Sequence, residues 1–529
     1  MRIKTQIDYR FPVLMAGAVA GSAFLQARQR PNIVLFMVDD MGWQDTSVPF
    51  WTQRTPLNDT YETPNMERLA RQGMLFSEAY ASAISSPSRC SLLTGVNAAR
   101  HRVTNWTFRK GQMTDGQDDL LLSPDWNYNG ICQAEGTPNT FVACSFVDVL
   151  RSAGYHTIHC GKAHWGAQDT PGESPLHFGF EVNIAGHAAG GPATYLSEHN
   201  FGHDAEGRPT AQFAIPGLQK YWGTGTFLTE ALTQEAIVAL KEWKRCNDEI
   251  TSLPHQEKEE GRPFFLYMSH YAVHIPIDRD MRFYEKYRDK GLSEKEAAYA
   301  SLIEGMDKSL GDILDWLDLN GQADRTIILF MSDNGGYATG AEWRDEPLFT
   351  QNAPLRSGKG SLLEGGIREP MIVRWPGVVE AGTRCDCYLC IEDFFPTILE
   401  MAGIRRYRVP QSVDGRSFVP LLRGTGDPSK GRCLVWNYPH VWGNRGPGID
   451  LNCAIREGDW KLLYSYKTGE KELYDIRHDI GEAHNLAAER PDLVRRLSRQ
   501  LGKRLRDMKA QRPTVQSTGQ PCPWPDERN

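Results

Sequence analysis

Residues 33 to 40 read Ile-Val-Leu-Phe-Met-Val-Asp-Asp, an unbroken apolar run that ends in two carboxylates. A second run, Ile327 to Met331, ends in Ser-Asp-Asn at positions 332 to 334. Short, continuous apolar runs are typical of strands that are buried on both faces of a parallel sheet. Both runs therefore predict central strands, with polar side chains directly after each one.

The segments around these two runs alternate between helix and strand patterns. Such alternation predicts an α/β fold with a large doubly wound, mostly parallel sheet flanked by helices. A charged and polar stretch at 245–262, which contains Pro254, predicts a surface loop. The expected helices are 66–74, 146–153, 229–243, 297–318 and 388–402, and the further expected strands are 264–268 and 371–375.

The pattern changes after Gly403. Residues 460–466 and 471–476 predict two strands joined by a turn, and 491–509 predict an amphipathic helix with many basic residues. We expect a smaller C-terminal α+β domain that carries an antiparallel sheet. The predicted division is a main α/β domain at 28–410 and the smaller domain at 411–529.

The first 27 residues have the features of a secretory signal peptide. Arg2 and Lys4 precede an apolar run from Phe11 to Leu25 that is rich in small residues. A signal-anchor helix is the alternative, but the run is short for a membrane span and is interrupted by two glycines. We expect an exported protein, in a periplasm or at a cell surface, with no stable membrane span.

Composition limits the classes of partner. A net charge of −7 over 529 residues argues against a general nucleic-acid binder, so an anionic substrate must be attracted by a local cluster of cations. The eleven cysteines are an odd number, so at least one has no partner within the chain, and spacing does not give the pairing. Cys385, Cys387 and Cys390 have no second pair at zinc-like spacing, and a local disulfide or buried thiols explain them as well.

Four side chains follow the two predicted central strands: Asp39, Asp40, Asp333 and Asn334. Ligands bind open α/β sheets at the carboxyl ends of the strands. The four side chains offer only oxygen ligands, which suit a hard cation such as Ca²⁺ or Mg²⁺ rather than zinc. The alternative is that each pair caps a helix or a turn.

Residues 85 to 95 read Ser-Ser-Pro-Ser-Arg-Cys-Ser-Leu-Leu-Thr-Gly. Pro87, followed by polar residues and then an apolar stretch, predicts the start of a helix. The free N–H groups at a helix start and the guanidinium of Arg89 form an anion site. An ordinary capped helix is the alternative for this run taken alone.

The same run resembles the signature of the formylglycine-dependent sulfatases of the alkaline-phosphatase-like superfamily, in which Ser85 is at the position of the nucleophile. Gly161-Lys162-Ala163-His164 resembles a second family element, with Ala163 in place of a tryptophan. Segments 269–276, 354–360 and 363–370 resemble further elements in the family's order. With the start at Arg30 and segments 460–462 and 472–475, the resemblance covers about residues 30 to 490.

The resemblance implies that Ser85 is oxidised to formylglycine (3-oxoalanine) by a serine-type maturation enzyme, which indicates a bacterial source. The hydrated aldehyde would supply one hydroxyl that attacks sulfur and a second that expels sulfate. Cys90 lies after the Pro-Ser-Arg motif, so we expect a buried helix thiol, and His270 is expected to be a bystander near the catalytic His274. The implied ligands of one Ca²⁺ are Asp39, Asp40, Ser85, Asp333 and Asn334, and the implied catalytic residues are Ser85, Arg89, Lys162, His164, His274 and Lys359.

A sulfuric ester hydrolase is the activity that the resemblance implies. Export and many Trp and Tyr residues favour a carbohydrate O-sulfate, with sulfated galactose or hexosamine from host glycans, such as mucin O-glycans or glycosaminoglycans, as the preferred substrate. Two alternatives remain: a phosphoesterase of the same superfamily, which usually needs two metals, and an idle glycan-binding protein with unmodified Ser85. The candidate sugar contacts are Asn105, Trp106, His187, His440, Trp442 and Arg445.

Overall fold

The first predicted strand, β1 (Asn32–Val38), lies inside a nine-stranded sheet and is fully buried. The computed structural model describes residues 30–251, 261–443 and 445–528. β1 is parallel to both of its neighbours, β8 and β9. The strand order is β11 (Thr383–Cys385), β2 (Met74–Tyr80), β10 (Arg368–Arg374), β9 (Thr326–Ser332), β1, β8 (Phe264–Ser269), β6 (His156–Gly161) and β7 (Val182–Ile184), with β12 (Leu389–Cys390) beside β2.

The sheet is mostly parallel, as the sequence predicts, and all four predicted strands of the main sheet are confirmed. β10 is the exception in direction, because it runs antiparallel to both β9 and β2. An apolar run gives no information on strand direction, so the sequence could not reveal this exception. The other strands β1, β8, β6 and β9 are parallel, so their carboxyl ends lie together at one edge of the sheet.

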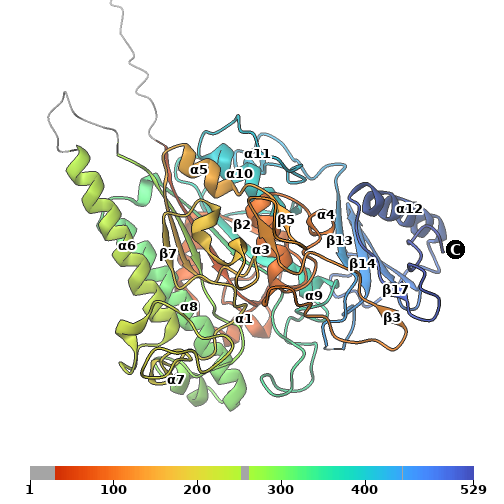
Figure 1. Cartoon of the computed structure of the whole chain (residues 1–529), viewed down its shortest axis with the longest axis horizontal. Coiled ribbons are helices and arrows are strands. Elements are labelled where there is room, and N and C mark those ends of the chain that lie inside the picture. The colour runs from red at the N-terminus through yellow and green to blue at the C-terminus, as the bar shows by residue number, and fades with distance from the viewer. Residues whose placement is uncertain (1–29, 252–260, 444, 529) are drawn as a thin grey trace, which may run out of the picture. The chain divides into compact units, whose positions relative to one another are not determined.

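Helices cover both faces of the sheet, which explains why its strands are apolar on both sides (Figure 1). Alternate side chains of β1 point to opposite faces: Val34 and Phe36 belong to one hydrophobic cluster, and Ile33 and Leu35 to the other. One face carries α2 (Pro64–Gln72), α6 (Leu228–Thr251), α7 (Tyr284–Asp289) and α8 (Glu294–Leu319), and the other carries α3 (Ser85–Thr94), α5 (Phe146–Ser152), α10 (Phe394–Met401) and α11 (Val419–Leu422).

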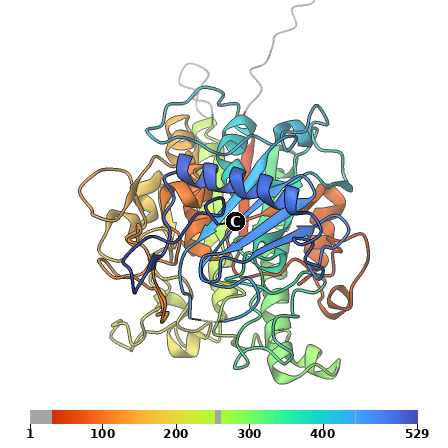
Figure 2. The same ribbon diagram turned by 90° about the vertical axis from the view of Figure 1, so that its right-hand side faces the viewer.

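A four-stranded antiparallel sheet follows in the C-terminal part, with one helix over it (Figure 2). The amphipathic helix α12 (Pro491–Asp507) buries Leu497, Leu501 and Leu505 against one face. The other face packs near Ile84 and Leu363, close to the start of α3. The strands are β13 (Cys433–Tyr438), β14 (Asn452–Glu457), β15 (Trp460–Ser465) and β16 (Lys471–Asp475).

The remaining elements are short. They connect the layers and build the loops around the sheet edge. The short helices are α1 (Pro56–Thr60), α4 (Ala98–His101) and α9 (Glu364–Ile367), with 3-10 turns at Pro171–Glu173, Pro175–Phe178, Ser197–His199, Gln219–Tyr221, Ala323–Arg325 and Ile391–Asp393. Two small sheets pair β17 (Thr514–Val515) with β3 (Leu121–Leu122) and β4 (Ile131–Cys132) with β5 (Phe141–Val142).

Some predictions differ from the structure in detail. α6 continues to Thr251, into the stretch 245–262 that the sequence predicts as a loop, and residues 252–260 lie outside the described chain. The predicted helix 388–402 is shorter, because β12 and a 3-10 turn precede α10. The predicted signal peptide also lies outside the described residues, and within them no helix has the length and apolarity needed to cross a membrane. All eleven cysteines are described, and each is a free thiol.

Candidate active site

Acidic side chains gather where β1 and β9 end. The two strands are parallel and in register to their last residues, so Asp39 and Asp40 meet Asp333 and Asn334. All four residues are fully buried. Carboxylate oxygens of Asp39, Asp40 and Asp333 lie within 4.8 Å of one another, and the Nδ2 group of Asn334 donates to Asp40 Oδ1 at 2.8 Å. The predicted meeting of the two strand ends is therefore found in the structure.

Ser85 is the first residue of α3 and faces this cluster. Its Oγ lies 3.1 Å from Asp39 Oδ1 and 3.1 Å from the amide oxygen of Asn334. The amine of Lys162, which follows β6, donates to Ser85 Oγ at 2.9 Å and to both carboxylate oxygens of Asp39 at 2.7 Å. The hydroxyl thus lies between a cation and oxygen ligands at a helix N-terminus.

Two more cations bind the acidic side chains. Arg89, one turn after Ser85 on α3, donates from Nε to Asp333 Oδ2 at 2.7 Å and from a terminal nitrogen to Ser269 Oγ at 2.6 Å. Lys359 donates to Asp40 Oδ2 at 2.7 Å. Each carboxylate of the cluster is therefore paired with a buried cation that comes from a distant segment of the chain.

Burial and crowding shift the pKa values of these groups. Burial raises the pKa of Asp39 to about 8, with Asp333 and Asp40 adding to the rise and Lys162 opposing it. Burial lowers the pKa of Lys162 to about 8. Burial alone would lower the pKa of Lys359, but the Asp40 carboxylate raises it above its usual value. Three carboxylates, one of them hard to ionise, form a donor set that a hard divalent cation fits, because it would keep all three ionised.

His274, which follows β8, reaches the same site. Its Nδ1 donates to the Ile275 carbonyl at 2.7 Å, which leaves Nε2 as the acceptor, 3.8 Å from Asp40 Oδ2. Burial and the charge of Lys359 lower the pKa of His274 to about 3. His270 lies elsewhere: it is fully buried, and its Nε2 lies 2.8 Å from Ser309 Oγ.

His164 lies close to a glycine-rich loop. Its Nε2 donates to the Thr107 carbonyl at 3.0 Å, and no described residue bonds its Nδ1. A Cβ atom on Gly190 would lie 2.4 Å from the His164 ring, and one on Gly191 would lie 2.5 Å from the His274 ring. The absence of side chains at the two glycines therefore lets this loop approach both imidazoles. The adjacent glycines are the sequence signal from which the position of the loop at the site could have been predicted.

A cavity of about 230 Å³ opens over Ser85 and is lined by four of the predicted catalytic residues. Its apolar wall was missed at the sequence level, since residues such as Phe213, Ile275 and Tyr337 belong to no charged motif. Their location in long loops leaves no periodic signal. The cavity is lined by Ile84, Ser85, Trp106, His164, Gly190, Phe213, His274, Ile275, Tyr337, Lys359 and Trp442.

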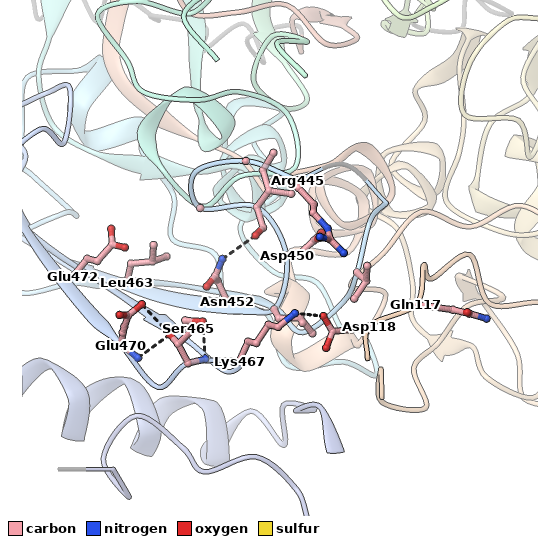
Figure 3. A pocket seen from close by; sticks show the side chains of 16 residues that line it. Gln117, Asp118, Arg445, Asp450, Asn452, Leu463, Ser465, Lys467, Glu470 and Glu472 are labelled. Carbon is pink, nitrogen blue, oxygen red and sulfur yellow. Dashed lines mark hydrogen bonds and ion pairs between the residues drawn. The ribbon is translucent and has the colours of Figure 1, made fainter. Parts of the chain in front are cut away.

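The predicted sugar contacts separate into groups. Trp106 and Trp442 line the Ser85 cavity and are half-buried, and Lys359 Nζ lies 5.8 Å from the centre of the Trp442 ring. His187 lies beside the cavity wall: its carbonyl accepts from the His164 backbone N–H, and burial lowers its side-chain pKa to about 4. Arg445 lines a different pocket (Figure 3).

Asn105 and His440 are fully buried. Asn105 Oδ1 accepts from the hydroxyl of Tyr438 at 3.2 Å. His440 Nδ1 lies 2.6 Å from Asp115 Oδ1, and its Nε2 lies 2.6 Å from Thr104 Oγ1. These contacts connect the segment of Trp106 to the segment of Trp442, so both residues support the cavity wall from behind.

Two family models match the chain. The model described as "Sulfatase" matches residues 31–404, and that described as "N-sulphoglucosamine sulphohydrolase, C-terminal" matches residues 358–511. Together the matched ranges include every segment that contributes to the Ser85 cavity.

The chain is also similar to individual proteins over most of its length. A sulfatase of Formosa agariphila is 30% identical, over 91% of this chain and 89% of that protein. The N-acetylgalactosamine-6-O-sulfatase of Bacteroides thetaiotaomicron is 28% identical, over 89% of this chain and 93% of that protein. The crystal structure of Ps i-CgsB in complex with k-i-k-neocarrahexaose has a TM-score of 0.69 at 26% identity, with 90% of this chain and 93% of that one covered. The chain belongs to the sulfatase family, with its α/β fold, and is a sulfuric ester hydrolase.

Proposed function

We propose that this sulfatase is exported and hydrolyses O-sulfate esters of galactose or hexosamine units in glycans, with N-acetylgalactosamine 6-sulfate as the first substrate to test. Two observations support this substrate class. Proteins similar to this chain include N-acetylgalactosamine-6-sulfatases from a human and a bacterial source, and a similar solved structure holds a neocarrahexaose. Export, to a bacterial periplasm or cell surface, rests on the sequence of the first 27 residues.

The position of Ser85 is the observation that carries the proposal. Its Oγ contacts Lys162, Asp39 and Asn334 and also lines the cavity. We propose that a serine-type maturation enzyme oxidises Ser85 to formylglycine, whose hydrate would supply the attacking hydroxyl and the second hydroxyl that releases sulfate. Lys162 would hold charge at this position and help to stabilise an oxyanion there.

We propose Ca²⁺ as the cation of the acidic cluster. Asp39, Asp40, Asp333 and Asn334, with residue 85, would hold it, and it would lower the proton affinity of the nucleophile. The described residues contain one such group of possible metal ligands. A phosphoesterase that needs two metals is therefore less well supported.

The remaining cations would bind the sulfuryl oxygens and the leaving group. Arg89 and Lys359 would stabilise charge on the sulfuryl oxygens as the ester bond breaks. Lys359 and His274 line the cavity and would bind the leaving oxygen. A bound sulfate ester brings negative charge close to His274 and favours its protonated form, which can then donate a proton. The free Nδ1 of His164 would accept a hydrogen bond from the nucleophile's hydroxyl.

Trp106 and Trp442 would hold the sugar. Aromatic rings present large, rigid faces at low entropic cost, and both rings line the cavity that contains Ser85. The cavity of about 230 Å³ favours one sugar unit with its sulfate.

Sulfate release tests the proposal. The enzyme, co-expressed with a serine-type maturation enzyme, is assayed with N-acetylgalactosamine 6-sulfate, galactose 6-sulfate and the matching phosphate esters, with the Ser85→Ala variant as the control. We expect sulfate release that Ser85→Ala abolishes and little phosphate release. Faster release of phosphate than of sulfate would favour the phosphoesterase, and glycan binding without any turnover would favour the idle binding protein.

A further inference from the structure

A second cavity, of about 310 Å³, lies at one end of the C-terminal sheet (Figure 3). We call it the loop pocket, because residues 441, 445, 446 and 448–451 of the loop before β14 form one wall and the β15–β16 turn, with Ser465 and Thr468, forms another. The neighbouring residues Val441 and Trp442 line different cavities: Val441 the loop pocket and Trp442 the Ser85 cavity. Adjacent residues of one loop therefore line both cavities.

The loop pocket has the lining of a carbohydrate site. Side chains such as Asn452 and Thr468 offer amide and hydroxyl groups, while Val441, Leu451 and Leu463 add an apolar surface. Such a mixture of an apolar surface and convergent polar groups suits a sugar ring, which has C–H faces and hydroxyl edges. Arg445 is exposed at the pocket and makes no hydrogen bond with the described residues, so its donors are available to a ligand.

Charge decides which kind of sugar fits. Four carboxylates line the loop pocket, against two cations, Arg445 and Lys467, and Lys467 is already paired with Asp118. The excess of carboxylates repels a sulfate group and accepts hydrogen bonds from neutral hydroxyls. The Ser85 cavity has the opposite character, because Lys359 is among its described lining residues and no carboxylate is. The carboxylates of the loop pocket are Asp118, Asp450, Glu470 and Glu472.

The loop that lines both cavities is fixed to the active site. Asp450 Oδ1 accepts from the Trp442 backbone N–H at 2.7 Å, which connects a wall of the loop pocket directly to a wall of the Ser85 cavity. Leu362 lies three residues after Lys359. Its backbone N–H donates to the Gly448 carbonyl at 2.9 Å. These bonds give both cavities a common, preformed wall.

We propose that the loop pocket is a second sugar subsite, which binds an unsulfated, uncharged unit of the same glycan whose sulfated unit occupies the Ser85 cavity. This inference rests on the proposed function, because it requires a glycan substrate. A glycan that occupies both cavities would cross the exposed residues Gly443 and Arg445 of the loop, in which the adjacent residues Val441 and Trp442 line one cavity each.

A length series tests the subsite. The substrates are N-acetylgalactosamine 6-sulfate alone and the same unit linked to one, two or three unsulfated galactose units. We expect kcat/KM of the wild type to rise about tenfold or more along the series, which corresponds to the binding of one further sugar. Thr468→Trp, at an exposed turn, fills the loop pocket, and Arg445→Ala removes a donor. Both variants should lower the ratio of kcat/KM between the longest and shortest substrates toward one, whereas Thr425→Trp, at another exposed turn, should keep it.

Calorimetry separates this inference from the proposed function. Wild-type protein should bind the unsulfated galactose trisaccharide, and Thr468→Trp should abolish this binding. A wild type without length preference, or a Thr468→Trp variant that retains it, would overturn the subsite and leave the sulfatase proposal intact. A third outcome is that no member of the series is hydrolysed, while the trisaccharide binds the wild type and does not bind Thr468→Trp. The proposed substrate would then be wrong, and the loop pocket would still be a sugar site.

Discussion

The Nζ of Lys162 lies 2.9 Å from the Oγ of Ser85, and both groups are buried. The same amine lies 2.7 Å from both oxygens of Asp39. Lys162 therefore joins the residue proposed as the nucleophile to the acidic cluster proposed as the metal site. Its loss should affect both chemistry and stability.

We expect Lys162→Met to lower kcat by about 10²-fold or more, because a buried cation at the nucleophile is lost. It should also destabilise the fold by about 3 kcal/mol, since buried Asp39 loses its nearest cation and keeps only the Arg89 guanidinium at 3.8 Å. The double variant Lys162→Met/Asp39→Asn should regain much of the stability and none of the activity. Sulfate release and chemical denaturation measure the two effects, and an active single variant would exclude the role of Lys162.

The two histidines after β8 should behave in opposite ways. His274 lines the cavity, so His274→Ala should lower kcat by about 10²-fold or more with little change in melting temperature. His270 is bonded to Ser309 away from the cavity, so His270→Ala should cost about 1–3 kcal/mol and leave kcat nearly unchanged. Kinetics and thermal melting of the pair provide matched controls, and an active His274→Ala enzyme would remove its acid role.

Calcium should stabilise the protein through the acidic cluster. Ligand at 100 times its Kd adds about 2.7 kcal/mol to the free energy of unfolding. We expect Ca²⁺ to raise the melting temperature of the wild type after chelation, and Asp333→Asn to lose most of this rise. Asp312→Asn, at a half-buried position of α8 that is paired with Lys308, is the control. An equal response of wild type and Asp333→Asn would place the cation elsewhere.

His440 should influence substrate binding without touching substrate. Its contacts with Asp115 and Thr104 fix the segments of Trp106 and Trp442. His440→Gln should therefore raise KM for sulfated sugars more than it lowers kcat, because the two rings lose their fixed positions. A fall in kcat at unchanged KM would show that the network serves another purpose.

Stability should fall as pH rises because of Asp307. This α8 side chain accepts the backbone N–H groups of Asn65 and Met66 at the start of α2, yet burial raises its pKa to about 7. Its ordinary pKa is about 3.9. The fold thus favours the protonated form of Asp307. The contribution of this form to the free energy of unfolding is complete below about pH 4 and is lost as pH rises through 7. The free energy of unfolding of Asp307→Asn should change less between pH 5 and pH 8 than that of the wild type. The same change in both proteins would contradict the role of Asp307.

The sequence could predict the parts of this protein that have a local signal. Continuous apolar runs identified β1 and β9, and the carboxylates after them led to the acidic cluster, because parallel strands end at one edge. The antiparallel direction of β10 and the approach of Tyr337 and Phe213 to Ser85 depend on tertiary packing. Arg445 was grouped with Trp442 by proximity in sequence, but the loop turns the two side chains into different cavities.

The oxidation state of residue 85 tests the central claim most directly. Trypsin releases residues 72–89, a peptide that ends at Arg89 and contains Ser85. Fragmentation mass spectrometry of this peptide, from protein made in its own host, should find the loss of two hydrogens at position 85 and at no other serine. An unmodified serine at that position would contradict the formylglycine mechanism.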